Sequence, residues 1–272
     1  MNEGINSWIQ KQPITATPID LSIVIPAYNE ARRLPPTLID MVDYFDASGL
    51  SYEIIVVDDG SNDATADVVR KFERVRGQVR LIALARNSGK GHAVRVGALN
   101  SRGKRVLFAD ADGATPIKET TRLLAALDEG FDVAIGSRAM ASNDTKVSTV
   151  IYRKLLGRIF NRCVNLFILP GIADTQCGFK VFTREAAQFL FQHQRSDRFS
   201  FDVELLFLAR KAGFSVKEVP VNWTNIPGSK VNLAFDAALM FRDIFRFRLI
   251  HRNVTKESRN EGPAPESSSA VL

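Results

Sequence analysis

Two carboxylates, Asp110 and Asp112, follow a short apolar run at residues 104–109. Strand residues alternate between faces, so a spacing of two aims both side chains into one cleft. The two groups repel each other unless a cation lies between them. Carboxylates are hard ligands, and the local string has neither His nor Cys, so it favours Mg²⁺ or Mn²⁺ over zinc. Taken alone, the pair could instead end a strand and cap a loop.

Apolar runs rich in β-branched residues alternate with helical patterns along the first half of the chain. The strand patterns occupy residues 21–26, 52–58, 79–84, 104–109 and 131–135. Strands that alternate with helices of this length predict right-handed βαβ units, and therefore an α/β fold with a mainly parallel central sheet flanked by helices. Ligands of such sheets bind at the carboxyl ends of the strands.

Polar residues follow several of these predicted strands. Asp58 and Asp59 follow the second, Asp110 and Asp112 the fourth, and Arg138 the fifth. Because the carboxyl ends of parallel strands share one edge of a sheet, the pattern predicts a polar rim. Each group alone is also compatible with a turn or a helix cap.

Lys90 lies in a glycine-rich string, Ser88–Gly91, at the start of a helical pattern. The string is not a Walker A loop, because the upstream glycine and the Ser or Thr after the lysine are missing. A lysine in such a turn is nonetheless a candidate contact for phosphate or nucleotide.

The composition limits the class of protein. A net charge of +6 over 272 residues suits a polyanionic partner, which could be nucleic acid, an anionic bilayer or a phosphorylated substrate. Two cysteines form no disulfide framework and agree with a reducing compartment. No apolar run of about 18 residues occurs, so no membrane span is predicted.

The second half of the chain contains two amphipathic helical patterns with basic faces, at residues 151–169 and 233–250. A row of basic residues is usually a solvated face, but it could also lie on lipid head groups. The predicted organisation is a leader at 1–19, one domain at 20–252 and a polar, disordered tail at 253–272.

Six motifs together resemble those of one enzyme family. They are Ile25–Glu30, Val57–Ser61, Asp110–Asp112, Gly136–Arg138, Asp174–Lys180 and Phe201–Leu206. The series is similar to family 2 of the inverting glycosyltransferases, whose members have the nucleotide-sugar-binding GT-A fold. Within the family the chain resembles the polyprenyl-phosphate glycosyltransferases, and strings at 89–97, 108–115 and 221–230 are similar to the dolichyl-phosphate β-glucosyl branch. The likeness covers roughly residues 20–250.

The resemblance implies a UDP-sugar donor bound through a divalent cation, with Asp110 and Asp112 as the metal ligands. It implies Asp112, Arg138 and Asp202 as the catalytic residues. A bound divalent ion neutralises a departing diphosphate. Tyr28 would stack on the base and Lys230 would contact the diphosphate. The matching donor-pocket positions are Pro26, Ala27, Tyr28, Glu30, Asp58, Asp59, Lys90, Asp110, Ala111 and Lys230.

The resemblance also implies a lipid-phosphate acceptor. A phosphate monoester is already an anionic nucleophile, so it needs cations to position it more than a general base. Arg138 and Arg153 match acceptor-phosphate positions of the mannosyl relatives, and guanidinium groups suit phosphate oxygens. Asp174 and Asp202 would orient these cations or the sugar hydroxyls, and Asp202 could alternatively be a base.

Two departures from the family qualify this prediction. Ala114 occupies the position of a glutamine that helps to hold the metal in mannosyl relatives. Two carboxylates, diphosphate and water would then hold the ion, as Mg²⁺ tolerates. The eukaryotic glucosyl enzymes carry an N-terminal membrane anchor, whereas the first 20 residues here show no apolar run. We therefore expect peripheral attachment to the cytoplasmic face of a membrane through the basic helices.

The expected function is metal-dependent transfer of glucose from UDP-glucose to a polyprenyl phosphate, with inversion. One alternative is the same scaffold with another donor, such as GDP-mannose or UDP-N-acetylglucosamine, or with a soluble or glycerolipid acceptor. Another is a non-catalytic nucleotide-binding membrane scaffold. A nucleic-acid binder is not favoured, because no binding module is recognisable and an acidic rim repels phosphate.

Overall fold

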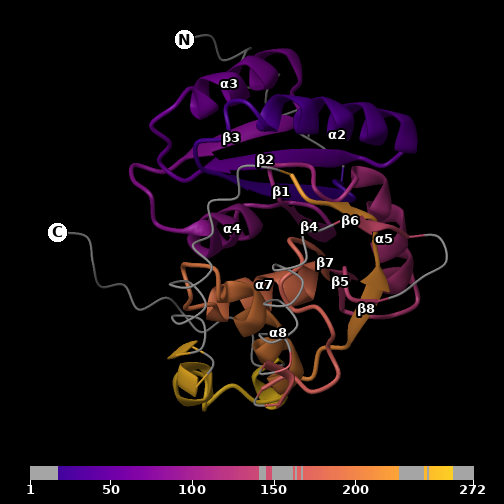
Figure 1. The fold of residues 1–272 in the computed structure, drawn as a ribbon, viewed down its shortest axis with the longest axis vertical. Helices are drawn as coiled ribbons and strands as arrows, with labels where there is room; N and C mark the ends of the chain where they lie inside the picture. Colours follow the sequence, from indigo (N-terminus) through magenta and orange to yellow (C-terminus); the bar gives the residue numbers. More distant parts are fainter. Residues whose placement is uncertain are drawn as a thin grey trace, which may run out of the picture.

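A seven-stranded sheet forms the centre of the protein in the computed structural model (Figure 1). The structure describes residues 18–140, 145–148, 162, 164–166, 168–226, 242–243 and 245–259. The strands lie in the order β3-β2-β1-β4-β7-β5-β8. Their bounds are β1 (Leu21–Ala27), β2 (Tyr52–Asp58), β3 (Val79–Ala83), β4 (Arg105–Ala109), β5 (Val133–Ser137), β7 (Phe179–Thr183) and β8 (Val216–Pro220).

The predicted parallel pairing is confirmed, with one exception. β1, β2, β3 and β4 pair in parallel, as do β5 and β8. β7 lies between β4 and β5 and runs antiparallel to both. The start of β7 therefore lies at the same edge of the sheet as the carboxyl ends of its two neighbours.

Helices cover both faces of the sheet. They are α2 (Leu34–Ser48), α3 (Thr65–Val75), α4 (Lys90–Leu99), α5 (Thr120–Asp128), α7 (Arg184–His193) and α8 (Phe201–Lys211). On one face Ile23 belongs to a buried apolar layer with residues of α2 and α5, and on the other Val24 belongs to a layer with residues of α4, α7 and α8. Figure 1 shows α2 and α3 at one end of the molecule and α7 and α8 toward the other. Burial of the sheet on both faces explains its continuous apolar strands.

Helix boundaries agree with the sequence at α2 and differ at α5. α2 has proline in its first turn and ends at Gly49, whose φ of 75° is left-handed and suits glycine. The sequence Thr115–Pro116 is typical of a helix start, with proline at the first helical position. Pro116 is instead extended, at φ −58° and ψ 136°, and a short 3₁₀ turn, Ile117–Glu119, precedes α5.

The sequence over 216–223 has the alternating apolar pattern of a single strand, but in the structure this stretch is divided. β8 ends at Pro220, which has no N–H to donate to a continuing ladder. A second strand, β9 (Trp223–Thr224), leaves the main sheet and pairs with β6 (Val147–Ser148). The division brings the Thr224 N–H to the carbonyl oxygen of Ala114, at 2.9 Å, and so places β9 against the loop after β4.

The C-terminal part of the described chain packs on α8. His251 Nε2 lies 2.6 Å from Glu204 Oε1, and both side chains are buried. Our predicted tail begins at residue 253, but residues 253–259 are described, and Arg259 donates to Asp132 and stacks on the Phe214 ring at 4.2 Å. Most of the two predicted amphipathic helices, at 151–169 and 233–250, lies outside the described residues.

Candidate active site

The two predicted metal ligands lie where β4 ends. The backbone N–H of Asp110 donates to the Gly178 carbonyl at 3.1 Å, which ties the loop to the start of β7. Asp112 Oδ1 accepts from the Ala114 N–H at 3.1 Å. Burial and the neighbouring charge of Asp110 both raise the pKa of Asp112. The acid pair is therefore held close together in spite of its repulsion.

Two cations balance the acid pair. Lys90 Nζ lies 2.6 Å from Asp110 Oδ1, and Arg33 Nη1 lies 3.7 Å from Asp112 Oδ2. Burial disfavours the charged form of Lys90, but Asp110 and then Asp202 outweigh that effect and raise its pKa. The ammonium group consequently stays charged beside the acid pair.

Asp59 fixes the turn that carries Lys90. Its two carboxylate oxygens accept the backbone N–H groups of Ser88 and Gly89, each at 2.8 Å. The φ of Gly89 is 110°, a conformation that suits glycine, and a Cβ there would overlap the Asp197 carbonyl. Asp59 thus uses both oxygens to shape the rim, which the sequence could not distinguish from a contact with nucleotide.

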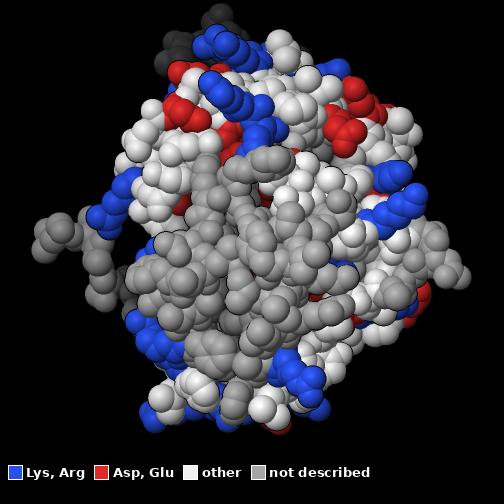
Figure 2. Space-filling model, viewed as in Figure 1, with Lys and Arg blue, Asp and Glu red and all other residues white. Residues whose placement is uncertain are grey.

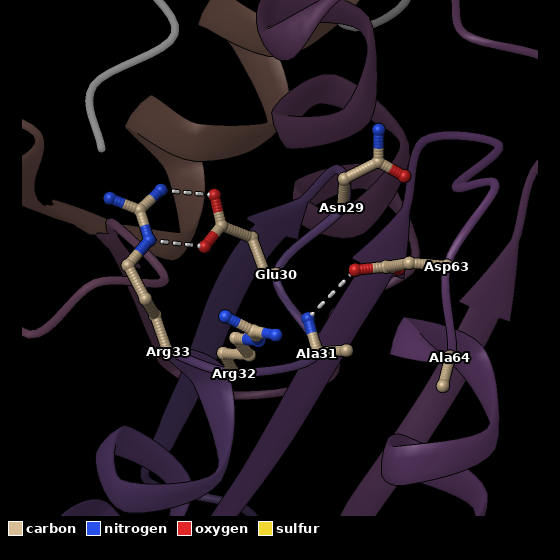
Figure 3. Close-up of a pocket in the computed structure, with 7 residues that line it drawn as sticks. All are labelled: Asn29, Glu30, Ala31, Arg32, Arg33, Asp63 and Ala64. Atoms are coloured by element: carbon tan, nitrogen blue, oxygen red, sulfur yellow. Dashed lines mark hydrogen bonds and ion pairs between the residues drawn. The ribbon is translucent and has the colours of Figure 1, made fainter.

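The loop after β1 borders a hollow of about 460 Å³ (Figure 3). In Figure 3, Glu30 and Arg33 face each other, with Nε and Nη2 donating to the two carboxylate oxygens at 2.7 and 2.5 Å. The Glu30 N–H donates to Thr65 Oγ1 at 2.8 Å, which joins the loop to the start of α3. The hollow is lined by Asn29, Glu30, Ala31, Arg32, Arg33, Asp63 and Ala64.

The remaining predicted donor residues frame this part of the rim. Pro26 and Ala27 are buried within β1, Tyr28 is half-buried just beyond it, and Ala111 is buried between the two predicted metal ligands. Asp58 ends β2, where Oδ1 accepts from the Ser61 N–H at 3.1 Å and from the Ser61 hydroxyl. Asp58, like Asp59, supports a turn through its carboxylate.

Arg138 follows β5 and is held by a buried carboxylate. Nε and Nη2 donate to Asp174 Oδ2 and Oδ1 at 2.7 and 2.9 Å, and the backbone N–H adds a bond of 2.9 Å. Burial favours neutral Asp174, but Arg138 outweighs burial and lowers the pKa of that carboxyl. The Trp223 ring lies 5.5 Å from the guanidinium carbon, and Glu218 accepts the backbone N–H groups of Ala173 and Asp174 at 2.7 and 2.8 Å. The guanidinium is thus fixed in orientation.

Asp202 lies beneath the rim rather than on it. It is 4% exposed, and its Oδ1 accepts from the buried Lys180 ammonium at 2.5 Å. Lys180 also donates to the Cys177 carbonyl, at 2.5 Å. Burial raises the pKa of Asp202 and outweighs the opposing effect of Lys180 and Lys90. The ion pair with Lys180 is compatible with the predicted orienting role of Asp202, which stays a prediction.

A family model decides between the classes of protein that this geometry allows. The model described as Glycosyl transferase family 2 matches residues 22–191, which include β1 to β7 and the acid pair. The chain belongs to glycosyl transferase family 2.

Individual relatives of this glycosyltransferase agree with that assignment. A Drosophila melanogaster protein named dolichyl-phosphate β-glucosyltransferase is 42% identical over 84% of this chain and 74% of its own length. A human protein of the same name is 40% identical over 84% of this chain and 75% of its own. A solved structure of Mycobacterium tuberculosis glucosyl-3-phosphoglycerate synthase, in complex with Mn²⁺ and UDP-glucose, is 17% identical, has a TM-score of 0.59, and covers 91% of this chain and 81% of that one. The predicted GT-A fold is confirmed.

The acid pair of this glycosyltransferase fits a hard divalent cation. Asp110 and Asp112 offer oxygens on one loop, and their repulsion would be relieved by an ion between them. Within the described residues no group of three or more His, Cys, Asp or Glu side chains could hold a metal. Asp110 and Asp112 would supply protein ligands, and water and substrate oxygens would complete the shell, as Mg²⁺ and Mn²⁺ accept.

The structure brings most of the predicted site residues to one rim and leaves two untested. Arg153 and Lys230, predicted for the acceptor phosphate and the donor diphosphate, lie outside the described residues. The remaining predicted residues surround the ends of β1, β2, β4 and β5, with Asp202 below them.

Four residues of the site were not assigned a role from the sequence. Arg33 pairs with Asp112, and Glu218 accepts the Asp174 N–H. Both partners are distant in the chain, and no motif marks Arg33 or Glu218. Gly178 is required because a Cβ would overlap the Asp110 carboxylate, and Lys180 neutralises Asp202. The last two belong to the string Asp174–Lys180, so the resemblance marked them without indicating their function.

Replacing Asp112 with Asn should stabilise the fold while abolishing metal binding. The change removes the charge that Asp110 repels and keeps the oxygen that accepts from Ala114. The pKa of Asp112 is raised on folding, so the folded protein binds the proton more tightly and wild-type stability gains as pH falls through that raised pKa. We expect the variant to have the higher melting temperature at neutral pH, with the difference shrinking toward about pH 4.

Thermal unfolding in metal-free buffer measures both melting temperatures, and Asp128→Asn, an exposed carboxylate at the end of α5, is the control. A wild type that is more stable than Asp112→Asn at neutral pH would contradict the repulsion.

Proposed function

We propose that this glycosyltransferase transfers glucose from UDP-glucose to a dolichyl-type polyprenyl phosphate, with inversion at the anomeric carbon and with Mg²⁺ or Mn²⁺. The observation that carries the proposal is an acid pair and a carboxylate-bound arginine on one rim of the sheet. The names of the fly and human relatives support the sugar and the acceptor, since those proteins align with most of this chain.

The donor would bind at the end of β4 and in the hollow after β1. Asp110 and Asp112 would hold the divalent ion, which supplies charge neutralisation for the departing diphosphate. Lys90 adds a cation at the N-terminus of α4, where backbone N–H groups also favour phosphate. The fold of a neighbour solved with Mn²⁺ and UDP-glucose supports this arrangement.

The acceptor phosphate would bind at Arg138. Its guanidinium is oriented by Asp174 and is 31% exposed, so it can meet an anion at the surface. A phosphate oxygen attacks the anomeric carbon, the bond from that carbon to the diphosphate oxygen breaks, and the electron pair leaves with the diphosphate. The nucleophile is already an anion, so no residue has to remove a proton. We therefore assign Asp202 to orientation and not to base catalysis.

Turnover of a panel of labelled nucleotide sugars with a short polyprenyl phosphate tests this function. We expect UDP-glucose to be the preferred donor, the product to be the β-anomer, and EDTA to abolish transfer until Mg²⁺ or Mn²⁺ is restored. Preference for GDP-mannose or UDP-N-acetylglucosamine, or for a soluble acceptor, would replace the proposed substrates. No turnover with any pair would favour the non-catalytic scaffold.

Replacing Arg138 with Lys should weaken acceptor use selectively. The lysine keeps a positive charge near Asp174 but loses the two-pronged contact with Asp174 that orients the guanidinium toward an anion. We expect KM for the lipid phosphate to rise about tenfold, which is the effect of losing one charged hydrogen bond. KM for UDP-glucose should change little. Steady-state kinetics with each substrate varied provide the measurement. Arg105→Lys, at an exposed ion pair with Asp128, is the matched control. Equal changes in both KM values would remove Arg138 from the acceptor site.

We also propose that the protein attaches peripherally to the cytoplasmic face of an anionic membrane. No helix among the described residues is long and apolar enough to cross one. The C-terminal segment exposes Phe245, Leu249 and Ile250 beside Arg246 and further arginines. Figure 2 shows Lys and Arg side chains at the lower margin of the molecule, where this segment lies in Figure 1. Apolar and basic side chains together suit a lipid surface.

Replacing Leu249 with Glu should reduce binding to vesicles that contain anionic lipid. Leu249 is 73% exposed, and losing its burial in lipid should lower the partition coefficient about thirtyfold, the equivalent of roughly 2 kcal/mol. Val75→Glu is the matched control, because Val75 is 75% exposed on α3. Co-sedimentation at low salt provides the measurement, and equal binding of the two variants would contradict attachment through this segment.

A further inference from the structure

The ammonium group of Lys90 lies on a carboxylate oxygen of one of the two predicted metal ligands. Lys90 Nζ is 2.6 Å from Asp110 Oδ1, within hydrogen-bond distance. A metal ion and an ammonium group bound to the same carboxylate would lie only a few ångströms apart. Both are positive, so they would repel each other strongly at that distance. Lys90 and the metal therefore compete for Asp110.

The surroundings of Lys90 keep its charge near the site and leave Asp110 as its ion-pair partner among the described residues. Asp202 acts on Lys90 electrostatically, but its Oδ1 is already bound by Lys180 at 2.5 Å. The Phe108 ring lies next to both lysines, 5.3 Å from Lys90 Nζ and 6.0 Å from Lys180 Nζ. Asp110 is thus the one carboxylate with an ion pair to Lys90 among the described residues.

The backbone around Lys90 is fixed, so that movement is confined to its side chain. Asp59 binds the N–H groups of Ser88 and Gly89, and a Cβ at Gly91 would overlap atoms of the loop before α8. The side chain has a flexible stem of four carbons, which lets the ammonium change partners while the turn stays in place.

We infer that Lys90 is a displaceable internal cation, which neutralises Asp110 until the diphosphate of the donor draws it away and leaves that carboxylate to the metal. The inference rests on the proposed function, because it takes the donor to be a nucleoside diphosphate sugar. Metal and nucleotide then bind cooperatively, because the diphosphate removes Lys90 from the carboxylate that the metal uses. By linkage, each strengthens the other by the same factor.

Binding of Mn²⁺ to the full chain without nucleotide, followed by electron paramagnetic resonance, tests this role. We expect Lys90→Gln to bind Mn²⁺ about tenfold more tightly than the wild type, a coupling of ordinary size. Lys90→Arg keeps a cation and should stay near the wild-type affinity. Lys104→Gln removes an equal charge from an exposed pair with Asp20 and should also change little. Thermal unfolding verifies that each variant is folded.

Three results would overturn the inference. They are an unchanged or weaker Mn²⁺ affinity in Lys90→Gln, an equal gain in Lys104→Gln, or a gain that disappears in high salt, which would indicate screened long-range charge and not a direct ion pair.

Adding UDP separates this inference from the proposed function. We expect UDP to strengthen Mn²⁺ binding less in Lys90→Gln than in the wild type. If UDP fails to bind Mn²⁺-saturated protein at all, the proposed donor is wrong, whereas the result without nucleotide still decides the role of Lys90.

Discussion

The repulsion between Asp110 and Asp112 is the constraint on which the rest of the site depends. Two carboxylates close to each other raise the free energy of the folded chain, so they persist only where the surrounding structure holds them. The Gly178 carbonyl holds the Asp110 backbone, the Ala114 N–H holds Asp112, and Lys90 and Arg33 supply opposite charge. The same unfavourable interaction makes the loop receptive to a cation.

Buried ion pairs around the acid pair orient side chains more than they stabilise the fold. Taking a lysine and a carboxylate out of water costs several kcal/mol per ion, and their attraction offsets this cost only with good geometry. Lys180 with Asp202, and Arg138 with Asp174, satisfy that condition through additional hydrogen bonds to the backbone. Both pairs lie around β7 and fix charges whose positions the chemistry needs.

The sequence predicted the parts of the structure that depend on local pattern. Strand and helix alternation indicated the α/β sheet, and the positions of Asp110, Asp112 and Arg138 at strand ends indicated the rim. The antiparallel direction of β7 was not predictable from periodicity, because a strand has the same alternation in either direction.

The partners of the site residues were equally hidden from the sequence. Pairing of Lys180 with Asp202, or of Glu218 with the N–H of Asp174, joins residues that are far apart in the chain. Such contacts follow from tertiary packing, so resemblance to a family marked some of these residues without giving their roles. The amphipathic pattern at 151–169 lies mostly beyond what the structure describes, and its predicted contact with lipid stays a prediction.

The placement of β7 fixes the distance between the acid pair and Arg138 across the rim. Because this strand separates β4 from β5, the acid pair and Arg138 belong to strands two spacings apart, a span of roughly 10 Å set by backbone hydrogen bonds. Loops can vary around this rim without changing that span, since the width of one inserted strand, and not the length of any side chain, separates the proposed anchoring points of the two substrates.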